Sequence, residues 1–450
     1  MLTNEELQSS MSNYLEKIKN RPVHFIGCGG VGMAPLALIL HKQGCRVTGS
    51  DLEASEKTVE LEKNGIGFSI GHSTLNMPPD GQDAVVVYSS AVKDSNPELT
   101  AARKRGWECL RRGEMLARLT SSYRRTISIS GSHGKTTVTT MLVHILLAHH
   151  LDIGYMIGGK ALGMPAWSAG DGDVFVTEVD ESDGSHTLID SHIGIITNVE
   201  DDHCWSVGGV SQLMNNFKTF AARAPKIIYV ADATTSTLFS DHPDRIELQR
   251  NDILTPGYFE EFDPQLYRTW GDYQLINAAL AVEAAAELGI EYGSALRSLR
   301  SYAGVARRMT EHLMSADYCL IEDYAHHPTE VKASLSTLKK RFPERQLCVV
   351  FQPHRYARLE RYLEEFADIL RTYADVVLIT PVFAAWSEKK AITSEMLAEE
   401  VGGKARYLDF PWARMAQAVL RVAKKPAVIA VIGAGDITNL VPELKKRIEC

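Results

Sequence analysis

The sequence predicts an α/β protein of three domains, in which Rossmann-like N-terminal and C-terminal domains flank a central P-loop-type domain with a mostly parallel sheet. Two short apolar runs, near residues 23 and 126, are each followed by a glycine turn and a helical pattern. A third alternation of strand and helix patterns begins near residue 318. The 450-residue length suits about three domains. We place them at residues 1–122, 123–306 and 307–450.

The composition narrows the class of partner. A net charge of −8 argues against a general nucleic-acid-binding or membrane-binding surface. The seven cysteines are scattered singly, which is typical of a reducing compartment and not of a disulfide framework. The polar N-terminus does not resemble a signal peptide, and no apolar run is long enough to span a bilayer. We therefore expect a cytoplasmic protein, as a monomer or a homodimer.

The first expected strand, residues 23–26, leads into a G-x-G-x-x-G turn and a helix over residues 33–43. Asp51 follows the next strand, at residues 46–49. This pattern is the fingerprint of a dinucleotide-binding turn, in which glycines admit a diphosphate and the carboxylate binds ribose hydroxyls. The alternative is a plain β–α turn with a solvated Asp51. The glycines concerned are Gly27, Gly29, Gly30 and Gly32.

A further strand is expected at residues 84–88, followed by Ser89 and Ser90. Ligands bind at the carboxyl ends of parallel strands in open α/β sheets, so both serines are candidate binding residues. Ordinary loop capping is an equal alternative. Residues 121–123 are expected to link this domain to the next.

The strongest motif is the stretch TISISGSHGKTTVTT at residues 126–140. A buried strand, a glycine loop and a Lys-Thr pair that opens a helix make up a phosphate-binding loop. We expect Lys135 to reach the terminal phosphates of a nucleotide and Thr136 to place its hydroxyl on Mg²⁺. The spacing G-x-x-G-K-T-T departs from the common form, so a glycine-bearing β–α turn is the alternative. The loop residues are Gly131, Ser132, His133, Gly134, Lys135, Thr136 and Thr137.

Two acidic clusters follow expected strands in the central domain. Residues 174–183 place Glu178 and further acids after an apolar strand, which is costly without a cation. Residues 195–203 end in His203. We expect Thr136, Glu178 and His203 to converge on a divalent metal; a surface-loop histidine and a solvated acidic turn are the alternatives. Asn277 lies in the first turns of an Ala-rich helix and is placed to contact a base.

In the last third, strands are expected at residues 318–322, 347–351, 376–380 and 427–432, and helices at 329–340, 359–371 and 412–422. Two strand exits are dense in polar residues: EDYAHHPTE at 322–330 and FQPHRYAR at 351–358. Arg355 and Arg358 are candidates for binding a carboxylate in bidentate fashion. A surface salt-bridge patch is the alternative. Gly433 to Ile437 form a third glycine turn after a strand.

Taken together, these motifs resemble the Mur ligases of peptidoglycan assembly across nearly the whole chain. The resemblance is closest to the members that add L-alanine. The stretches of sequence on which the resemblance rests are HFIGCGGVGM, SSAVKDSNPE, GSHGKTTVTTM, EVDESDGSH, TNVEDDH, GVARRM, EDYAHHPTE, FQPHRYAR and GAGDI. The resemblance implies a UDP-sugar domain, a central ATPase and a domain that brings the amino acid. It also implies an ATP-driven ligase that joins L-alanine to the muramoyl carboxylate of UDP-N-acetylmuramate through an acyl phosphate, with ATP and Mg²⁺.

The resemblance implies a role for each candidate. Lys135 contacts the γ-phosphate, and Thr136, Glu178 and His203 hold metal ions, with Lys135, Glu178 and His203 as the catalytic set. ATP binding is implied for the loop residues, for Asn277 at the adenine, for Arg308 at the phosphates and for Asp323 at the ribose. UDP-sugar binding is implied for Gly27, Gly29, Gly30, Gly32, Asp51, Ser89 and Ser90. Amino-acid binding is implied for Tyr324, His326, His354, Arg355 and Arg358.

The chain departs from the family pattern at residues 204–208, 273–274 and 383–388. These departures concern the sugar-side and base-side contacts and leave the phosphate chemistry intact. Lys218 follows His203 by a spacing close to that of the carbamylated lysine of sister ligases, with a surface lysine as the alternative.

Three other functions are consistent with parts of the pattern. A recycling ligase that adds a tripeptide to UDP-N-acetylmuramate shares many of the motifs. An NAD-dependent oxidoreductase would use Gly27, Gly29, Gly32 and Asp51 but leaves the Lys135 loop unexplained. A catalytically silent sugar-nucleotide-binding protein would bind UDP-N-acetylmuramate without forming ADP.

Overall fold

The computed structural model describes residues 14–202, 204–255, 257–259, 263–385 and 389–449. The described chain forms two compact units. The first unit runs to Asp263 and includes Ile276–Ala303, and the second contains Pro264–Leu275 and the chain from Gly304 onward. Each unit is built on parallel β-sheet, as the sequence predicts.

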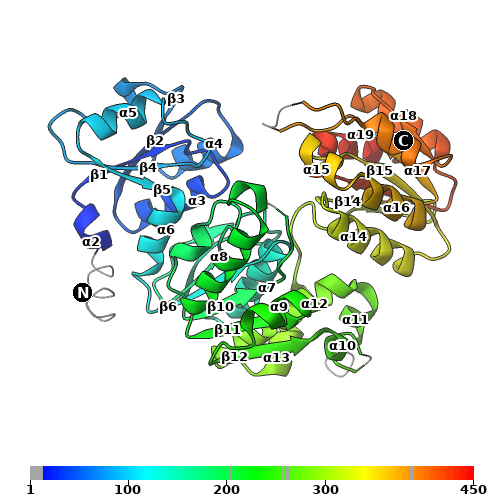
Figure 1. Cartoon of the computed structure of the whole chain (residues 1–450), viewed down its shortest axis with the longest axis horizontal. Coiled ribbons are helices and arrows are strands. Elements are labelled where there is room, and N and C mark those ends of the chain that lie inside the picture. The colour runs from blue at the N-terminus through cyan, green and yellow to red at the C-terminus, as the bar shows by residue number, and fades with distance from the viewer. Residues whose placement is uncertain (1–13, 203, 256, 260–262, 386–388, 450) are drawn as a thin grey trace. The chain divides into compact units, whose positions relative to one another are not determined.

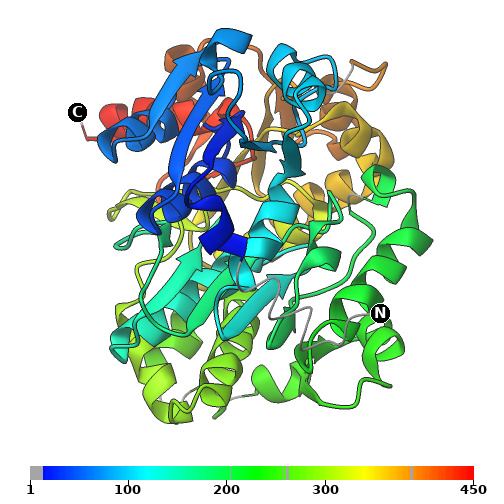
Figure 2. The ribbon, with the colours of Figure 1, turned by 90° about the vertical axis from the view of Figure 1, so that its left-hand side faces the viewer.

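The first unit begins with a five-stranded parallel sheet in the order β3-β2-β1-β4-β5, whose blue and cyan strands lie side by side in Figures 1 and 2. This is the strand order of the dinucleotide-binding fold. Val85 and Val87 of β4 face one core and Val86 faces another, so both faces of the sheet are covered. The elements are α2 Tyr14–Ile18, β1 Pro22–Ile26, α3 Met33–Lys42, β2 Arg46–Asp51, α4 Glu56–Lys63, β3 Gly67–Ile70, β4 Val85–Tyr88, α5 Pro97–Lys104, β5 Glu108–Arg111 and α6 Arg112–Thr120.

A seven-stranded sheet follows in the order β12-β11-β10-β6-β9-β7-β8, parallel except for the β7–β8 pair. The strand β6 lies between β9 and β10, so the three strand ends meet at one edge of the sheet. The elements are β6 Arg125–Ser130, α7 Lys135–Ala148, β7 Ile153–Met156, β8 Trp167–Ser168, β9 Val174–Glu178, β10 Ile193–Ile196, α8 Val210–Ala222, β11 Lys226–Ala231, α9 Ala233–Phe239, β12 Arg245–Gln249, α10 Arg250–Ile253, α12 Asp272–Glu287 and α13 Tyr292–Ser298.

The second unit holds a six-stranded sheet in the order β13-β14-β18-β15-β16-β17, parallel except for the β13–β14 pair. Side chains of β18 alternate between two cores: Val428 and Ala430 face one, and Ile429 and Val431 face the other. The elements are α11 Pro264–Thr269, β13 Thr310–Met314, β14 Tyr318–Asp323, α14 Pro328–Arg341, β15 Gln346–Phe351, α15 Tyr356–Arg361, α16 Leu363–Tyr373, β16 Val376–Ile379, α17 Ser394–Val401, β17 Ala405–Tyr407, α18 Trp412–Val422, β18 Ala427–Ile432 and α19 Leu440–Ile448.

The fold class is confirmed, and one predicted helix is corrected. Instead of a single helix over residues 359–371, the chain forms α15 and α16, which meet at Tyr362. The φ of Tyr362 is −119°, outside the helical region, and its buried ring packs edge-on against His327. The domain boundaries at residues 122 and 306 stay a prediction, and the three sheets lie within the three predicted ranges. In the part of the chain that the structure describes, no helix has the length and apolar character needed to cross a membrane.

Candidate active site

The predicted phosphate-binding loop connects β6 to the N-terminus of α7. Gly131 has a φ of 139°, and a Cβ there would overlap the Thr197 hydroxyl and lie 2.9 Å from the carbonyl oxygen of Asn198. Gly134 has a φ of 84°, and a Cβ there would lie 2.8 Å from Oδ1 of Asn277. Both positions therefore require glycine. The loop also places the amides that begin α7 where an anion is favoured.

The segment after β10 fixes the shape of this loop. The Thr197 hydroxyl donates to the carbonyl oxygen of His133 at 2.6 Å. The carboxamide of Asn198 accepts from the His133 amide at 2.9 Å and donates to its carbonyl at 3.0 Å. The amide of Glu200 donates to the Ser132 hydroxyl at 2.9 Å. These bonds hold Ser132 and His133 in one conformation, so this part of the loop has little order to gain when an anion binds.

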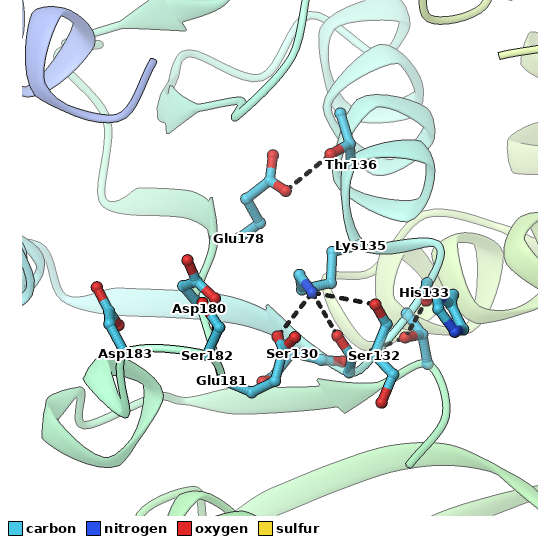
Figure 3. Close-up of polar contacts among 12 residues, drawn as sticks. Ser130, Ser132, His133, Lys135, Thr136, Glu178, Asp180, Glu181, Ser182 and Asp183 are labelled. Atoms are coloured by element: carbon cyan, nitrogen blue, oxygen red, sulfur yellow. Dashed lines mark hydrogen bonds and ion pairs between the residues drawn. The ribbon is translucent and has the colours of Figure 1, made fainter. Parts of the chain in front are cut away.

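Lys135 is the first residue of α7, and its ammonium points back into the loop (Figure 3). Its Nζ lies 2.6 Å from Oε2 of Glu181 and also donates to the carbonyl oxygen of Gly131. Burial acts to lower the pKa of Lys135, but the carboxylates of Glu181 and Asp180 outweigh it and raise this pKa. Lys135 therefore carries a positive charge at the phosphate-binding loop.

Glu181 was not among the predicted site residues, and the structure buries it completely beside Lys135. Burial raises the pKa of Glu181 to about 7, although the Lys135 ammonium opposes the rise. A signal was present in the sequence, because an acid three residues after an apolar strand is costly to bury unless a cation lies next to it. The sequence does not tell which acid of residues 180–183 has that partner.

Thr136 and Glu178 point toward each other, as predicted (Figure 3). The Thr136 hydroxyl donates to Oε2 of Glu178 at 2.8 Å, and the other carboxylate oxygen accepts from the Gly158 amide. Burial raises the pKa of Glu178, and the hydrogen bonds from Gly158 and Thr136 and the charge of Lys135 offset this rise only in part. A hydroxyl and a carboxylate beside a phosphate-binding loop are oxygen ligands suited to Mg²⁺. The third predicted ligand, His203, lies outside the described residues.

Other predicted residues of the central domain are placed as follows. Asn277 lies on α12 with its carboxamide against Gly134, so it borders the phosphate-binding loop, and its contact with a base stays a prediction. Thr137 is half-buried on α7. Lys218 is exposed on α8, whose buried side is formed by Phe217 and Phe220, which favours the surface-lysine alternative.

The predicted sugar-nucleotide residues gather at the carboxyl ends of β1, β2 and β4. The carboxylate of Asp51 accepts from the Gly29 amide at 2.7 Å. Gly27 has a φ of 77°, and a Cβ there would lie 3.3 Å from Cβ of Ser89. The structure thus brings together the residues that the sequence separates: Gly27, Gly29, Gly30, Gly32, Asp51 and Ser89, with the exposed Ser90 next in the chain.

Arg112 was also missed, and it connects this glycine turn to the acidic loop after β9. A Cβ on Gly32 would lie 3.1 Å from Cδ of Arg112. The guanidinium of Arg112 donates to Asp183 at 2.9 Å and to the Ser185 hydroxyl at 3.4 Å. The sequence holds no signal for this link, which depends on how the two sheets of the first unit pack.

Glu98 is a fully buried carboxylate at the start of α5. It accepts from the Ser73 amide at 2.9 Å and the Asn76 carboxamide at 2.8 Å, and the hydroxyl of Ser50 donates to it as well. Burial opposes ionisation, but hydrogen bonds from His24, Ser50, Ser73 and Asn76 lower the pKa of Glu98 to about 2. Glu98 therefore anchors the segment of residues 73–76 as an anion.

Acidification is expected to destabilise the protein through Glu98. The pKa of Glu98 is about 2 in the folded state, against an ordinary value of 4.5. Its contribution to the free energy of unfolding is therefore complete above pH 4.5 and is lost as the pH falls toward 2. That loss is roughly 3 kcal/mol. Urea unfolding between pH 5 and 2.5 measures it: Glu98→Gln should be less stable at pH 5 and lose less stability on acidification. Parallel pH profiles for the two proteins would contradict this role.

The candidates in the second unit lie at the carboxyl ends of β14 and β15. The ring of His326 lies 5.4 Å from the ring of Tyr324 and 5.4 Å from that of His354. Arg358 is buried and lies 3.2 Å from Nδ1 of His354. Arg355 precedes α15 with a φ of 66°, a strained value for a residue with a side chain. The five predicted amino-acid-binding residues thus lie at two strand exits of one sheet, which the strand β18 separates.

Arg308 and Asp323, predicted to bind ATP, belong to this second unit. Arg308 donates to Glu330 at 3.1 Å, and its guanidinium lies 5.2 Å from the centre of the Tyr324 ring. Burial raises the pKa of Asp323 to about 6, and its carboxylate accepts from the amides of Met309 and Ala325. Their contacts with ATP stay a prediction.

Comparisons with known proteins agree with this geometry. Three family models match the chain: "Mur ligase family, catalytic domain" at residues 22–124, "Mur ligase middle domain" at 129–253 and "Mur ligase, glutamate ligase domain" at 307–435. A relative from Anaeromyxobacter dehalogenans, named UDP-N-acetylmuramate–L-alanine ligase, is 35% identical over 97% of this chain and 99% of its own length. The chain belongs to the Mur ligase family. The predicted family resemblance is therefore confirmed.

Two further comparisons place this Mur ligase more closely. A relative from Gloeobacter violaceus with the same name is 33% identical over 95% of this chain and 96% of its own length. The crystal structure of a UDP-N-acetylmuramate–alanine ligase from Thermotoga maritima is 25% identical and superposes with a TM-score of 0.75, covering 95% of this chain and 99% of that one. The Mur ligase thus aligns with both proteins over nearly its whole length.

Proposed function

We propose that the protein is an ATP-dependent ligase that joins L-alanine to the muramoyl carboxylate of UDP-N-acetylmuramate, in the synthesis of peptidoglycan precursors. Relatives of that name, 33–35% identical over nearly the whole chain, support the substrates. The observation that carries the chemistry is the arrangement at the ends of β6 and β9, where the Lys135 ammonium points into the glycine loop and the Thr136 hydroxyl donates to Glu178. We propose the predicted domain ranges 1–122, 123–306 and 307–450 for sugar nucleotide, ATP and amino acid.

The residues present fit a magnesium ion. The hydroxyl of Thr136 and the carboxylate of Glu178 offer oxygen ligands beside the loop, and His203 is the third proposed ligand. When bound, Mg²⁺ supplies positive charge that offsets the triphosphate and polarises the transferred phosphoryl group.

The reaction begins with attack of the muramoyl carboxylate on the γ-phosphorus of ATP. This step forms an acyl phosphate and releases ADP. The ammonium of L-alanine loses a proton to solvent, and the neutral amine attacks the acyl carbon. The nitrogen releases a second proton as inorganic phosphate leaves the tetrahedral intermediate and the amide forms. Two anions must meet in the first step, so fixed positive charge is the main requirement. Lys135, the loop amides and the N-terminus of α7 provide it without reorganising.

The sugar nucleotide is proposed to bind at the Gly27–Gly32 turn, with Asp51, Ser89 and Ser90 around it. The Asp51 carboxylate already fixes the turn through the Gly29 amide, so it acts on the ligand and on the loop together. ATP is proposed to bind the Lys135 loop and Asn277, and Arg308 and Asp323 stay predicted ATP-binding residues. We expect a cytoplasmic enzyme, where ATP and Mg²⁺ are available.

Arg355→Ala is expected mainly to raise the KM for L-alanine. Removing a guanidinium that binds a carboxylate costs about 1.5–3 kcal/mol, or roughly 10- to 100-fold. Initial rates with varied L-alanine at saturating ATP and UDP-N-acetylmuramate measure this effect, with Arg421→Ala as control because Arg421 is an exposed arginine on α18. An unchanged KM for L-alanine in the Arg355 variant would argue against the role.

The proposed function is tested by ADP release with UDP-N-acetylmuramate, ATP and Mg²⁺ against a panel of acceptors. The panel contains L-alanine, L-serine, glycine and the tripeptide used by recycling ligases. We expect L-alanine to support the highest kcat/KM. Preference for the tripeptide would identify a recycling ligase, and binding of the sugar nucleotide without ADP would identify a silent homologue.

A further inference from the structure

The third glycine turn, Gly433 to Asp436, has no role in the function proposed above. It follows β18, which lies between β14 and β15 in the sheet. The turn is therefore at the centre of the carboxyl edge, between the strand exits that carry the proposed amino-acid-binding residues. Ligands of open α/β sheets bind at this edge.

Two buried or half-buried side chains hold the turn in place. Arg307 donates from Nη2 to the carbonyl oxygens of Gly433 at 2.8 Å and Gly435 at 3.0 Å. Gln352, which is only 3% exposed, accepts from the Ile437 amide at 3.1 Å and donates to Oδ1 of Asp436 at 2.7 Å. The buried side chain of Gln352 therefore orients the carboxylate of Asp436.

The turn also lies next to the Arg355 segment. A Cβ on Gly435 would overlap the ring of Phe383. That ring stacks on His354 with centroids 5.7 Å apart, and the carbonyl oxygen of Phe383 accepts from the Arg355 amide at 2.9 Å. One phenylalanine therefore contacts both the turn that carries Asp436 and the segment that carries Arg355.

Acceptors are scarce at this edge, whereas cationic donors are plentiful. Glu322 is paired with Arg307 and His312, and Glu330 with Arg308 and His326. Asp323 accepts from two backbone amides, as described above. Among the described residues of these three strand exits, Asp436 is the one carboxylate that is exposed. Within the same set of residues, its carboxylate has a single hydrogen-bond partner, Gln352.

We propose that Asp436 binds the ammonium group of the incoming L-alanine while Arg355 binds its carboxylate. This assignment rests on the proposed function and names the second half of the amino-acid site. The two charged groups of an α-amino acid are attached to one carbon. Neighbouring strands lie about 4.8 Å apart, so an acceptor after β18 and a donor after β15 can reach the two groups together. Gln352 positions the acceptor, which holds the nitrogen in one orientation; the ammonium then loses a proton to solvent before the neutral amine attacks.

Asp436→Asn tests the assignment, because it keeps the shape and removes the charge. The KM for L-alanine should rise about tenfold or more, with the KM values for ATP and UDP-N-acetylmuramate unchanged. Asp409→Asn is the matched control, because Asp409 is an exposed aspartate that follows β17 on the same sheet. This substitution should leave the KM values for L-alanine, ATP and UDP-N-acetylmuramate unchanged. Asp436→Glu, which restores the charge, should recover part of the affinity.

Propionate separates the two halves of the site because it has the carboxylate of L-alanine without the ammonium. Its inhibition constant against L-alanine should be unchanged in Asp436→Asn and raised in Arg355→Ala. Two results would overturn this assignment and leave the proposed function standing. One is an active Asp436→Asn enzyme with the wild-type KM for L-alanine, and the other is an equal loss of affinity for propionate and for L-alanine in that variant. A wild-type protein that releases no ADP with L-alanine would overturn the proposed function, and this assignment with it.

Discussion

Lys135→Ala is expected to lower kcat for ADP release by about 10²–10³, which is equivalent to roughly 3–4 kcal/mol of transition-state stabilisation. The ammonium is held in the loop by its contacts with Glu181 and the carbonyl oxygen of Gly131. Preorganised charge of this kind is most effective where the attacking and accepting groups are both anions. The variant should bind UDP-N-acetylmuramate normally.

The fold should survive this substitution. Removing Lys135 leaves Glu181 buried without its cation, but burial already raises the pKa of Glu181 to about 7, so the carboxyl can take up a proton and become neutral. Lys135→Ala with Glu181→Gln removes both charges and should match the wild-type thermal unfolding temperature more closely while staying inactive. Lys104→Ala, at an exposed lysine on α5, serves as control. Near-wild-type ADP release from Lys135→Ala would refute the role of the loop lysine.

Gly131→Ala is expected to weaken nucleotide binding. The added methyl would overlap the Thr197 hydroxyl and press on the carbonyl oxygen of Asn198, and alanine disfavours a φ of 139°. Because Thr197 and Asn198 also bind His133, a displaced Gly131 would disturb the whole loop. We expect ADP affinity, measured by calorimetry, to fall by about tenfold or more, since a strained backbone residue alone costs on the order of 1–3 kcal/mol.

The matched control is Gly289→Ala. Gly289 also has a positive φ, 89°, but nothing lies within 4 Å of an added Cβ. It should therefore share the backbone strain and keep the wild-type affinity for ADP. If both variants lost ADP affinity equally, the packing of Gly131 against Thr197 would not be the cause.

Many of the strands that are buried on both faces were predicted from the sequence, whereas the buried strands β7 and β11 were not. The strands β1, β6 and β18 are apolar runs followed by glycine turns, and such runs are a local signal. The edge strand β12 has a half-exposed pattern, and β13 pairs antiparallel at the other sheet's edge. Neither has an apolar run, so neither was predicted. The break at Tyr362 was missed because it depends on packing against His327.

The residues of the candidate site also differ in whether a local sequence pattern indicates them. Lys135, Thr136 and Glu178 were found because each is adjacent in sequence to a strand end or a helix start. Glu181 and Arg112 were not found, since their partners are set by sheet topology: β9 pairs with β6 although β7 comes between them in the chain. Asn277 was predicted from its helix, yet its position beside Gly134 could be known only from the fold.

The most direct measurement of the central claim follows oxygen from the sugar nucleotide to phosphate. UDP-N-acetylmuramate labelled with ¹⁸O in its carboxylate is turned over with ATP, Mg²⁺ and L-alanine, and the released inorganic phosphate is analysed by mass spectrometry. Phosphorylation of the carboxylate at the Lys135 loop predicts one ¹⁸O atom in each phosphate, because the bridging oxygen leaves with phosphorus. Unlabelled phosphate released together with the amide product would contradict the account.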